Sequence, residues 1–255
     1  MLNLIKRTIS IIFIIPLILK IYNIPILFNI LTFSISVMGN LEFNKLNKIN
    51  NSYILVGQNI LSCIFCYTNI IYSILPNDII LSIVFILKII SNMFIYNEDL
   101  LIINIYKDCF GYIYTTHFIS YTLLLYKTKI VLFNLILSIS SFDIGSYIFG
   151  KIFGKTQLTI YSPNKTIEGV IGGLISSLTT TIIMNNFTII NKIIYGLIII
   201  SLSLFGDVFE SIIKRYANIK DSGNIIPGHG GILDRFDSYI FTIPIIYLIH
   251  NIFKL

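Results

Sequence analysis

Long apolar runs follow one another along nearly the whole chain, and short polar stretches separate them. A helix needs about 20 apolar residues to cross the hydrocarbon core of a bilayer, and several of these runs approach that length. The runs are continuous and do not alternate between apolar and polar residues, which argues against a membrane β-barrel. The pattern therefore predicts an all-α, polytopic integral membrane protein with about eight or nine transmembrane helices.

The order of the runs predicts where these helices lie. Residues 1–7 form a short basic start, and apolar residues continue to about residue 19 without a small-residue cleavage site. We therefore expect a retained first helix and not a cleaved signal peptide. Residues 100–106 form a shorter run that we expect to be partly embedded. The other expected spans lie at about 26–38, 53–75, 79–96, 110–126, 130–149, 170–184, 193–205 and 239–253.

Composition and charge support a membrane protein and exclude a soluble globular domain. The mean hydropathy is +0.85, and 55% of the residues are hydrophobic against only 12% that are charged. The net charge of +6 comes from Lys and Arg in short stretches between the apolar runs. This is the positive-inside pattern, which offers a surface to anionic lipid and not to nucleic acid. Membrane lipid is therefore an expected partner, and nucleic acid is not.

A few polar residues near the apolar runs are expected to have structural roles. Cys63 and Cys66 form a CxxC pair without a second ligand pair, so we expect them to pack in the apolar interior. Asp108 follows Lys107, and we expect the two to form a solvated or interfacial pair. Glu42 lies where the second run ends and is expected in an interfacial or cytoplasmic stretch.

The densest charge of the chain lies within residues 206–237. Charge of both signs beside segments of bilayer length is costly unless something binds there. A glycine-rich segment around His229 interrupts the charged residues, and its backbone amides could approach a phosphate closely. The charged residues of this stretch are Asp207, Glu210, Lys214, Arg215, Lys220, Asp221, Asp234, Arg235 and Asp237.

Helical spacing would bring part of this stretch together. Four residues have i, i+3, i+4 and i+7 spacing and would share one helix face: Asp207, Glu210, Ser211 and Lys214. Asp234 and Asp237, three residues apart, can also point the same way. Oxygen ligands without a Cys/His set favour Mg²⁺, and Mg²⁺ with Lys, Arg and a glycine loop is typical of phosphoryl or nucleotidyl transfer. The alternative is a charged cytoplasmic loop held by salt bridges.

A second polar stretch covers residues 143–173. Asp143 lies near the end of an apolar run, so its carboxylate should face a polar cavity. Residues 162–166 have turn chemistry, and Thr166 precedes a helix with Glu168 in its first turn. Two interpretations remain open at this point: a basic loop with a capped helix, or a phosphate-binding loop in which Lys165 lies beside a helix N-terminus.

The chain resembles the phosphatidate cytidylyltransferase family, also called CDP-diacylglycerol synthases. The family pattern S-x-x-K-R, four residues, K-D, a small residue two further on, then H-G-G-x-x-D-R-x-D is complete here. It consists of Ser211, Lys214, Arg215, Lys220, Asp221, Gly223, His229, Gly230, Gly231, Asp234, Arg235 and Asp237. The stretch from Asp143 resembles the family's D-x-G-A-Y-x-x-G and S-P-K-K-T-W-E-G segments, with Ser146, Asn164 and Ile167 as departures. The resemblance is strong over about 143–238 and weak before it.

The resemblance implies transfer of the cytidylyl group of CTP to phosphatidate, giving CDP-diacylglycerol and pyrophosphate. It implies Mg²⁺ held by Asp221 and Asp234, with Asp207 and Asp237 next, and a second, monovalent cation such as K⁺. Lys214, Arg215, Lys220, Lys165 and Arg235 would neutralise phosphate charge, and His229 would orient phosphate or transfer a proton. The remaining substrate-binding residues would be Asp143, Ser162, Thr166, Glu168, Ser211, Gly230 and Gly231. A homodimer in a bacterial-type inner membrane, with its active site facing the cytoplasm, is also implied.

We expect one membrane domain over residues 1–255, because no repeat, linker or soluble domain is visible. The N-terminal helices would occupy 1–140, the catalytic region 141–238 and the last transmembrane helix 239–255. Alternative enzymes are a CTP-dependent polyprenol kinase and an ether-lipid cytidylyltransferase. A transporter is an alternative of another class, since an acid within a span and broken helices would suit one.

Overall fold

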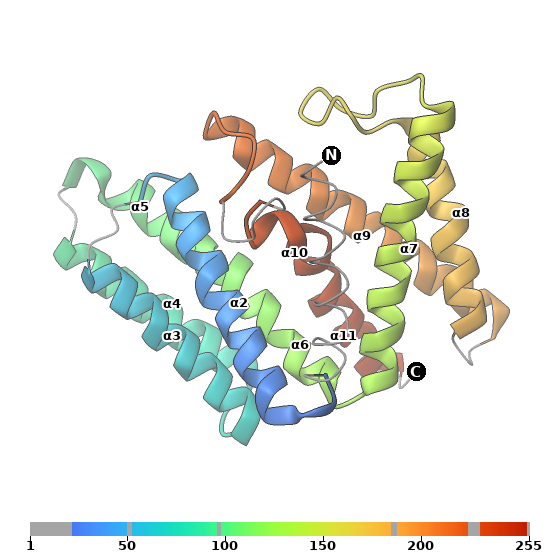
Figure 1. The fold of residues 1–255 in the computed structure, drawn as a ribbon. Coiled ribbons are helices and arrows are strands. Elements are labelled where there is room, and N and C mark those ends of the chain that lie inside the picture. The colour runs from blue at the N-terminus through green and yellow to red at the C-terminus, as the bar shows by residue number, and fades with distance from the viewer. Residues whose placement is uncertain (1–21, 50–52, 96–97, 185–187, 224–229, 254–255) are drawn as a thin grey trace. The chain divides into compact units, whose positions relative to one another are not determined.

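The computed structural model describes residues 22–49, 53–95, 98–184, 188–223 and 230–253, and most of these residues are helical. No strand occurs among them, apart from an isolated antiparallel bridge between Gln157 and Thr166. The predicted all-α fold is therefore confirmed, while the expected first helix lies outside the described residues. The helices are α2 (Pro25–Leu46), α3 (Tyr53–Tyr72), α4 (Asn77–Ile95), α5 (Glu98–Gly111), the π-helix η1 (Tyr112–His117), α6 (Phe118–Tyr126), α7 (Lys129–Phe153), α8 (Ile167–Met184), α9 (Ile189–Tyr216), α10 (Leu233–Ile240) and α11 (Thr242–Phe253) (Figure 1).

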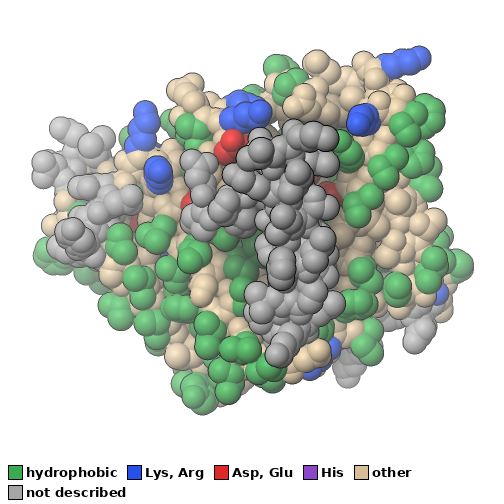
Figure 2. Space-filling model, in the orientation of Figure 1, with side chains coloured by type: hydrophobic (Ala, Val, Ile, Leu, Met, Phe, Trp, Pro, Cys, Tyr) green, Lys and Arg blue, Asp and Glu red, His purple; other side chains and the backbone are tan. Residues whose placement is uncertain are grey.

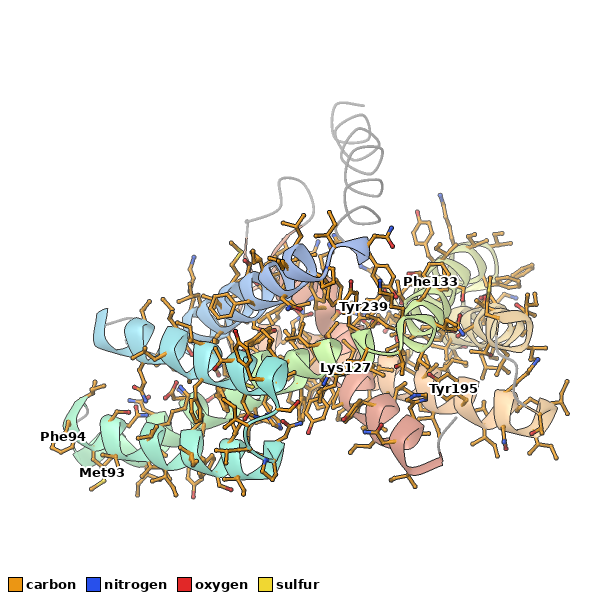
Figure 3. The ribbon with its side chains drawn as sticks, turned by 90° about the horizontal axis from the view of Figure 1, so that it is seen from below. Met93, Phe94, Lys127, Phe133, Tyr195 and Tyr239 are labelled. Atoms are coloured by element: carbon orange, nitrogen blue, oxygen red, sulfur yellow. The ribbon has the colours of Figure 1, made fainter. Side chains whose placement is uncertain are left out.

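Four helices of the described residues are long and apolar enough to cross a membrane, namely α2, α7, α8 and α9. Hydrophobic side chains occupy much of the visible surface in Figure 2. At the end of α4, Met93 and Phe94 point away from the neighbouring helices (Figure 3), and they are 60% and 86% exposed. An exterior this rich in large apolar side chains is suited to lipid, so the chain is a membrane protein.

Three expected boundaries differ from the structure, and the first is that α2 continues past residue 38 to Leu46. The run at 110–126 and the shorter piece at 100–106 belong to one continuous helical stretch, formed by α5, η1 and α6. The expected last helix, 239–253, is instead divided into α10 and α11. Pro244 explains the break between α10 and α11. It has no N–H to bond the carbonyl four residues earlier and is tolerated only in a first helical turn.

The chain divides into two compact units. The first contains Met1–Leu123 and Asp221–Arg235, and the second contains Leu124–Lys220 and Phe236–Leu255. The segment 221–235 therefore groups with the N-terminal helices, although in sequence it lies between the two parts of the second unit. In the first unit α2 packs on α3 and on η1. Asn40 donates a hydrogen bond to Thr115 Oγ1 (3.1 Å), and the hydroxyl oxygens of Ser36 and Tyr67 lie 2.6 Å apart.

The interior of the first unit contains a buried polar network, which corrects the expectation for Asp108. Its carboxylate is fully buried and forms an ion pair with Lys88 of α4, with 3.0 Å between Nζ and Oδ1. Lys88 also donates to Asn59 Oδ1 (2.5 Å), and Asn92 donates to Asp108 Oδ2 (3.0 Å). Lys107 does not pair with Asp108 but donates to the carbonyl of Asn47. The pair is interhelical because α4 and α5 pack together, which the sequence order did not show.

The buried cysteines have the expected packing role. Cys63 and Cys66 are free thiols in α3. The Cys63 sulfur lies 3.2 Å from Thr116 Oγ1, and Cys66 lies 3.4 Å from Ser120 Oγ. Both therefore face the helical stretch of η1 and α6 within the unit.

In the second unit α7 and α8 run side by side (Figure 1). Small residues permit this close approach: a Cβ on Gly173 would lie only 2.7 Å from the carbonyl oxygen of Phe142. Ser176 and Ser177 of α8 donate to the α7 carbonyls of Ser141 (3.0 Å) and Ser138 (2.8 Å). Small residues and interhelical hydroxyl bonds are common means of helix association in membranes. This closely packed pair carries the loop of residues 154–166 at one end.

Candidate functional site

Helix α9 carries the first group of predicted site residues. It continues past the apolar run to Tyr216, so Asp207, Glu210, Ser211 and Lys214 lie on one helix as expected. Lys214 forms an ion pair with Glu210, with 2.5 Å between Nζ and Oε2, and the Glu210 side chain is only 1% exposed. The cation of Lys214 is therefore held on α9 by a buried acid one turn earlier.

Asp207 lies between a cation and a second acid. The ammonium group of Lys165, from the loop before α8, forms an ion pair with Asp207 Oδ2. On its other side, Asp207 is hydrogen-bonded to the carboxyl of Asp237 on α10. Burial, and then the neighbouring Asp207 charge, raise the pKa of Asp237 well above its usual range. Two carboxyl groups in contact require a shared proton or a bound cation.

Gly206 permits this contact between α9 and α10. A Cβ at this position would collide with the carbonyl oxygen of Asp237 and would lie 3.4 Å from the Cα of Ser238. No larger residue could therefore stand there without moving one of the two helices. The glycine places Asp207 at the point where the two backbones meet.

A cavity of about 200 Å³ opens beside Asp207 within the second unit. Asp143 faces this cavity, as expected, and lines it together with the charged residues Lys165 and Asp207, although apolar residues such as Phe142 and Leu204 line it too. Ser146 Oγ, also at the wall, is buried and has no hydrogen-bond partner among the described residues. The lining residues are Phe142, Asp143, Ser146, Tyr147, Asn164, Lys165, Thr166, Gly169, Val170, Leu204 and Asp207.

The loop before α8 has its own internal scaffold. Thr166 Oγ1 accepts the N–H of Gly169 (3.1 Å) and so caps α8. The Glu168 carboxylate accepts the N–H groups of Lys155 (3.1 Å) and Thr156 (3.2 Å) and thereby closes the loop. In the turn that carries Lys165, the Ser162 carbonyl accepts the Lys165 N–H (3.1 Å). The capped-helix interpretation is confirmed, and phosphate binding by this loop stays a prediction.

The other basic residues predicted for the site do not all lie near the cavity. Arg215 Nε donates to the carbonyl of Tyr161 (3.3 Å), so it lies against the loop before α8. Lys220 and Arg235 are exposed. The structure thus brings Lys165 to the cavity, holds Lys214 on its helix, and leaves Lys220 and Arg235 at the surface of their own units.

The first unit contains the second group of predicted site residues. Asp221 is exposed, whereas Asp234 lies in the first turn of α10. Asp234 Oδ2 accepts the N–H groups of Ser222 (2.9 Å) and Gly231 (2.8 Å). Gly230 has φ +84°, and a Cβ there would lie 2.6 Å from Asp234 Oδ2. Gly230 and Gly231 therefore let the backbone wrap around the Asp234 carboxylate.

Glu42 contacts the segment 221–235, and the sequence analysis did not include it among the candidate site residues. The expected interfacial or cytoplasmic position stays a prediction, but within the first unit the Glu42 side chain is buried and only 5% exposed. Its Oε1 accepts the N–H of Ile232 (2.9 Å), and its Oε2 accepts the N–H of Leu233 (2.9 Å). The available signal was an acid within a long apolar helix, which needs a buried partner. The partner lies about 190 residues away in sequence, and no local pattern reveals it.

The site contains carboxylate oxygens suited to a hard cation such as Mg²⁺. Asp207 and Asp237 supply a contacting pair in the second unit, and Asp221 and Asp234 lie on one loop and helix of the first. Over the residues described, no three acidic, His or Cys side chains are grouped as a ready metal site. His229 lies outside the described residues, so its predicted role has no structural counterpart.

Comparison with known proteins agrees with these features. Phosphatidate cytidylyltransferases of Staphylococcus haemolyticus, Staphylococcus saprophyticus and Staphylococcus aureus are 51%, 50% and 50% identical to this chain over 113 residues. The matched segment covers 42% of this chain and 44% of each relative, so the chain spans less than half the length of these relatives. The model of the cytidylyltransferase family matches residues 5–253. Since that match extends over nearly the whole sequence, the chain belongs to the cytidylyltransferase family.

Proposed function

We propose that this protein is a phosphatidate cytidylyltransferase, which converts CTP and phosphatidate to CDP-diacylglycerol and pyrophosphate. The family match and the names of the relatives support this activity. The structural observation that carries it is the cavity in which Lys165 pairs with Asp207 beside Asp143. A cation, two carboxylates and the hydroxyl of Ser146 line this cavity, and such groups are suited to a charged phosphate ligand and a metal ion.

We further propose Mg²⁺ as the cofactor. The contacting carboxyl groups of Asp207 and Asp237 support it, because such a pair is costly unless a proton or cation compensates one charge. On the family resemblance, Asp221 and Asp234 of the first unit are the leading proposed metal ligands, with Asp207 and Asp237 next, and a monovalent cation such as K⁺ is proposed as a second ion. When bound, Mg²⁺ would supply charge neutralisation at phosphate oxygens.

The basic residues would bind the anionic groups of both substrates. Lys165 is the best placed, since its ammonium lies at the cavity wall. Lys214, Arg215, Lys220 and Arg235 would neutralise the rest of the triphosphate and lipid phosphate. Ser162, Thr166, Glu168, Ser211, Gly230 and Gly231 would shape the substrate site, mainly through the backbone geometry described above.

No general base is needed for the proposed reaction. The phosphate oxygen of phosphatidate is ionised at neutral pH and would attack the α-phosphorus of CTP in line, with pyrophosphate as the leaving group. Catalysis would then consist of positioning and charge neutralisation. His229 would orient a phosphate or carry a proton.

The membrane arrangement follows from the same proposal. Eight or nine spans, as expected from about 20 residues per crossing, would include the four long helices α2, α7, α8 and α9. The basic loops support a cytoplasmic active site in a bacterial-type inner membrane. A homodimer is the proposed assembly, on the family resemblance alone.

The test is an assay of the purified, detergent-solubilised protein with labelled CTP, phosphatidate and Mg²⁺. Lipid-soluble CDP product from the native chain, lost in Asp221→Asn and Asp234→Asn, would support both the activity and the metal ligands. Transfer of phosphate to a polyprenol, or of the cytidylyl group to an ether lipid only, would replace it with the alternative enzymes. A folded sample that does none of these would favour a transporter.

A further inference from the structure

We propose that Glu42 is a positioning residue for the backbone that carries Asp221 and Asp234. In this role it sets where the two carboxylates lie for the metal. This inference rests on the proposed function for its catalytic consequence but not for its structural one. Glu42 belongs to α2, whereas every group that it binds belongs to the segment 221–235 of the same compact unit. An acid of the N-terminal helices would thus control a site that is formed far along the chain.

All described hydrogen bonds of the Glu42 carboxylate go to this segment. It accepts the N–H groups of Ile232 and Leu233 at the start of α10 and the hydroxyl of Ser222 at 3.1 Å. It forms no ion pair with Lys or Arg in the described part of the chain. A buried charge without such a partner needs full hydrogen bonding, and the first N–H groups of a helix are donors without intrahelical partners. The helix N–H groups therefore supply the hydrogen bonds that the buried carboxylate needs, and the carboxylate supplies their acceptor.

The loop is shaped to the carboxylate. A Cβ on Gly231 would lie 2.6 Å from either Glu42 oxygen, and one on Gly223 would lie 3.0 Å from Glu42 Cδ. Both backbone segments thus approach the carboxylate so closely that no side chain fits between them. Glycine at these two positions is explained by contact with Glu42, in addition to any contact with substrate.

The hydrogen bonds continue from Glu42 to Asp234. Ser222 donates its hydroxyl to Glu42 and its N–H to Asp234 Oδ2. Gly231, which contacts Glu42, also donates its N–H to Asp234 Oδ2. Glu42 and Asp234 therefore hold the same short backbone segments from two sides. Asp221 directly precedes Ser222, so displacement of Ser222 would move both proposed metal ligands of this loop.

The charge and the length of Glu42 are both required by this arrangement. In Glu42→Gln one acceptor oxygen becomes an NH₂ donor, which would face the N–H groups at the start of α10. In Glu42→Asp the charge remains but the side chain is shorter, so part of the hydrogen bonding should be kept. Partners behind a metal ligand typically change metal affinity by about 10- to 100-fold when they are removed.

The experiment compares the full-length native chain with Glu42→Gln, Glu42→Asp and the control Asn40→Ala in detergent. Asn40 is a buried residue of the same helix, and its printed hydrogen bonds go to Thr115 and Asn44 and not to the groups that Glu42 binds. For each protein we would measure the thermal midpoint, the Mg²⁺-induced shift of that midpoint, the kinetic constants for CTP and phosphatidate, and hydrogen–deuterium exchange of the 230–240 segment.

We expect Glu42→Gln to raise the Mg²⁺ concentration at half-saturation by about 10- to 100-fold and to speed amide exchange at 232–233. The KM for phosphatidate should stay near its native value, and Glu42→Asp should restore part of the Mg²⁺ response. Asn40→Ala should lower the thermal midpoint without changing the Mg²⁺ requirement. Unchanged exchange and Mg²⁺ response in Glu42→Gln, or equal effects in Asn40→Ala, would overturn the positioning role. If the native chain made no CDP-diacylglycerol, exchange would still test Glu42, while the proposed activity would fail separately.

Discussion

Lys165, in the loop before α8, forms an ion pair with Asp207 on α9, and both residues line the cavity beside Asp143. The side chains are partly exposed, 31% for Lys165 and 16% for Asp207, so the pair faces the space and is not sealed within the helices. A phosphate entering this cavity would meet a cation that is already oriented. Lys165 also balances one charge of the Asp207–Asp237 pair, so it connects the proposed substrate site with the proposed metal site.

Replacement of Lys165 by Gln should weaken CTP binding. A hydrogen bond to a charged group contributes about 1.5–3 kcal/mol, which corresponds to roughly a 10- to 100-fold loss in kcat/KM for CTP. The measurement is initial-rate kinetics at saturating phosphatidate and varied CTP. The matched control is Lys155→Gln in the same loop, because the side chain of Lys155 does not line the cavity and is exposed. Equal losses in both variants would show that general loop charge matters and not the Lys165 site.

The raised pKa of Asp237 predicts a pH dependence of stability in the absence of Mg²⁺. The folded state keeps the Asp237 proton at a pH where the unfolded chain has lost it, so folding takes up a proton there. The free energy of unfolding should therefore fall as pH rises from about 4 towards the raised pKa, and it should level off above that value. Thermal unfolding in detergent with a chelator, over this range, measures the slope.

Asp237→Asn removes the titrating group from that experiment. The variant should unfold with a smaller pH slope and should be more stable than the native chain near neutral pH, because it removes a carboxyl group whose charged form is opposed first by burial and then by the Asp207 charge. It should also lose the stabilisation that Mg²⁺ gives to the native chain. Identical slopes in the two proteins would mean that another group controls the pH dependence.

The apolar pattern was sufficient to predict the long helices but not their polar contacts. The runs at 130–149, 170–184 and 193–205 correspond to α7, α8 and α9, since a bilayer-length apolar segment has few other folds. The helical continuation past residue 205 was also expected from the spacing of Asp207, Glu210 and Lys214. The continuous stretch from α5 to α6 was missed, because Asp108 is satisfied by Lys88 on another helix and a sequence pattern cannot show that pairing.

The candidate site was predictable in its residues and less so in its organisation. The sequence patterns and the family resemblance predict Asp143, Lys165, Thr166 and Asp207 as site residues, and the structure brings all four to one cavity. The sequence did not show that Gly206 lies against the Asp237 carbonyl, because that contact joins two different helices. Glu42 was missed for a related reason: a contact between an early helix and a late loop depends on tertiary packing, and local spacing does not encode it.

Gly206→Ala should destabilise the second unit. Its Cβ would collide with the carbonyl oxygen of Asp237, which is backbone and cannot rotate away, so α9 and α10 must separate. Overpacking of this kind costs about 1–3 kcal/mol, and the shift should also reduce activity by moving Asp207 from Asp237. Thermal unfolding and the CTP assay measure the two effects.

Gly57→Ala in α3 is the matched control for that substitution. A Cβ on Gly57 would meet nothing within 4 Å, so the only expected change is a gain of about 0.5–1 kcal/mol from helix propensity. The same Gly→Ala substitution should therefore lower the free energy of unfolding at Gly206 and raise it at Gly57. Destabilisation by Gly57→Ala as large as that by Gly206→Ala would contradict the close-approach explanation.

The buried pair of Lys88 and Asp108 predicts strong coupling between two substitutions. Lys88→Met leaves the Asp108 carboxylate buried with only the Asn92 amide as its described donor, and the loss of one partner from a buried ion pair costs about 3–5 kcal/mol. Asp108→Leu likewise leaves the Lys88 ammonium buried without its acidic partner. The double variant removes both charges at once, so its free energy of unfolding should fall by much less than the sum of the single changes.

A double-mutant cycle in detergent measures this difference. Additive losses would show that the two charges are compensated separately, by Asn59 and Asn92, and that the ion pair itself contributes little to the stability of the first unit.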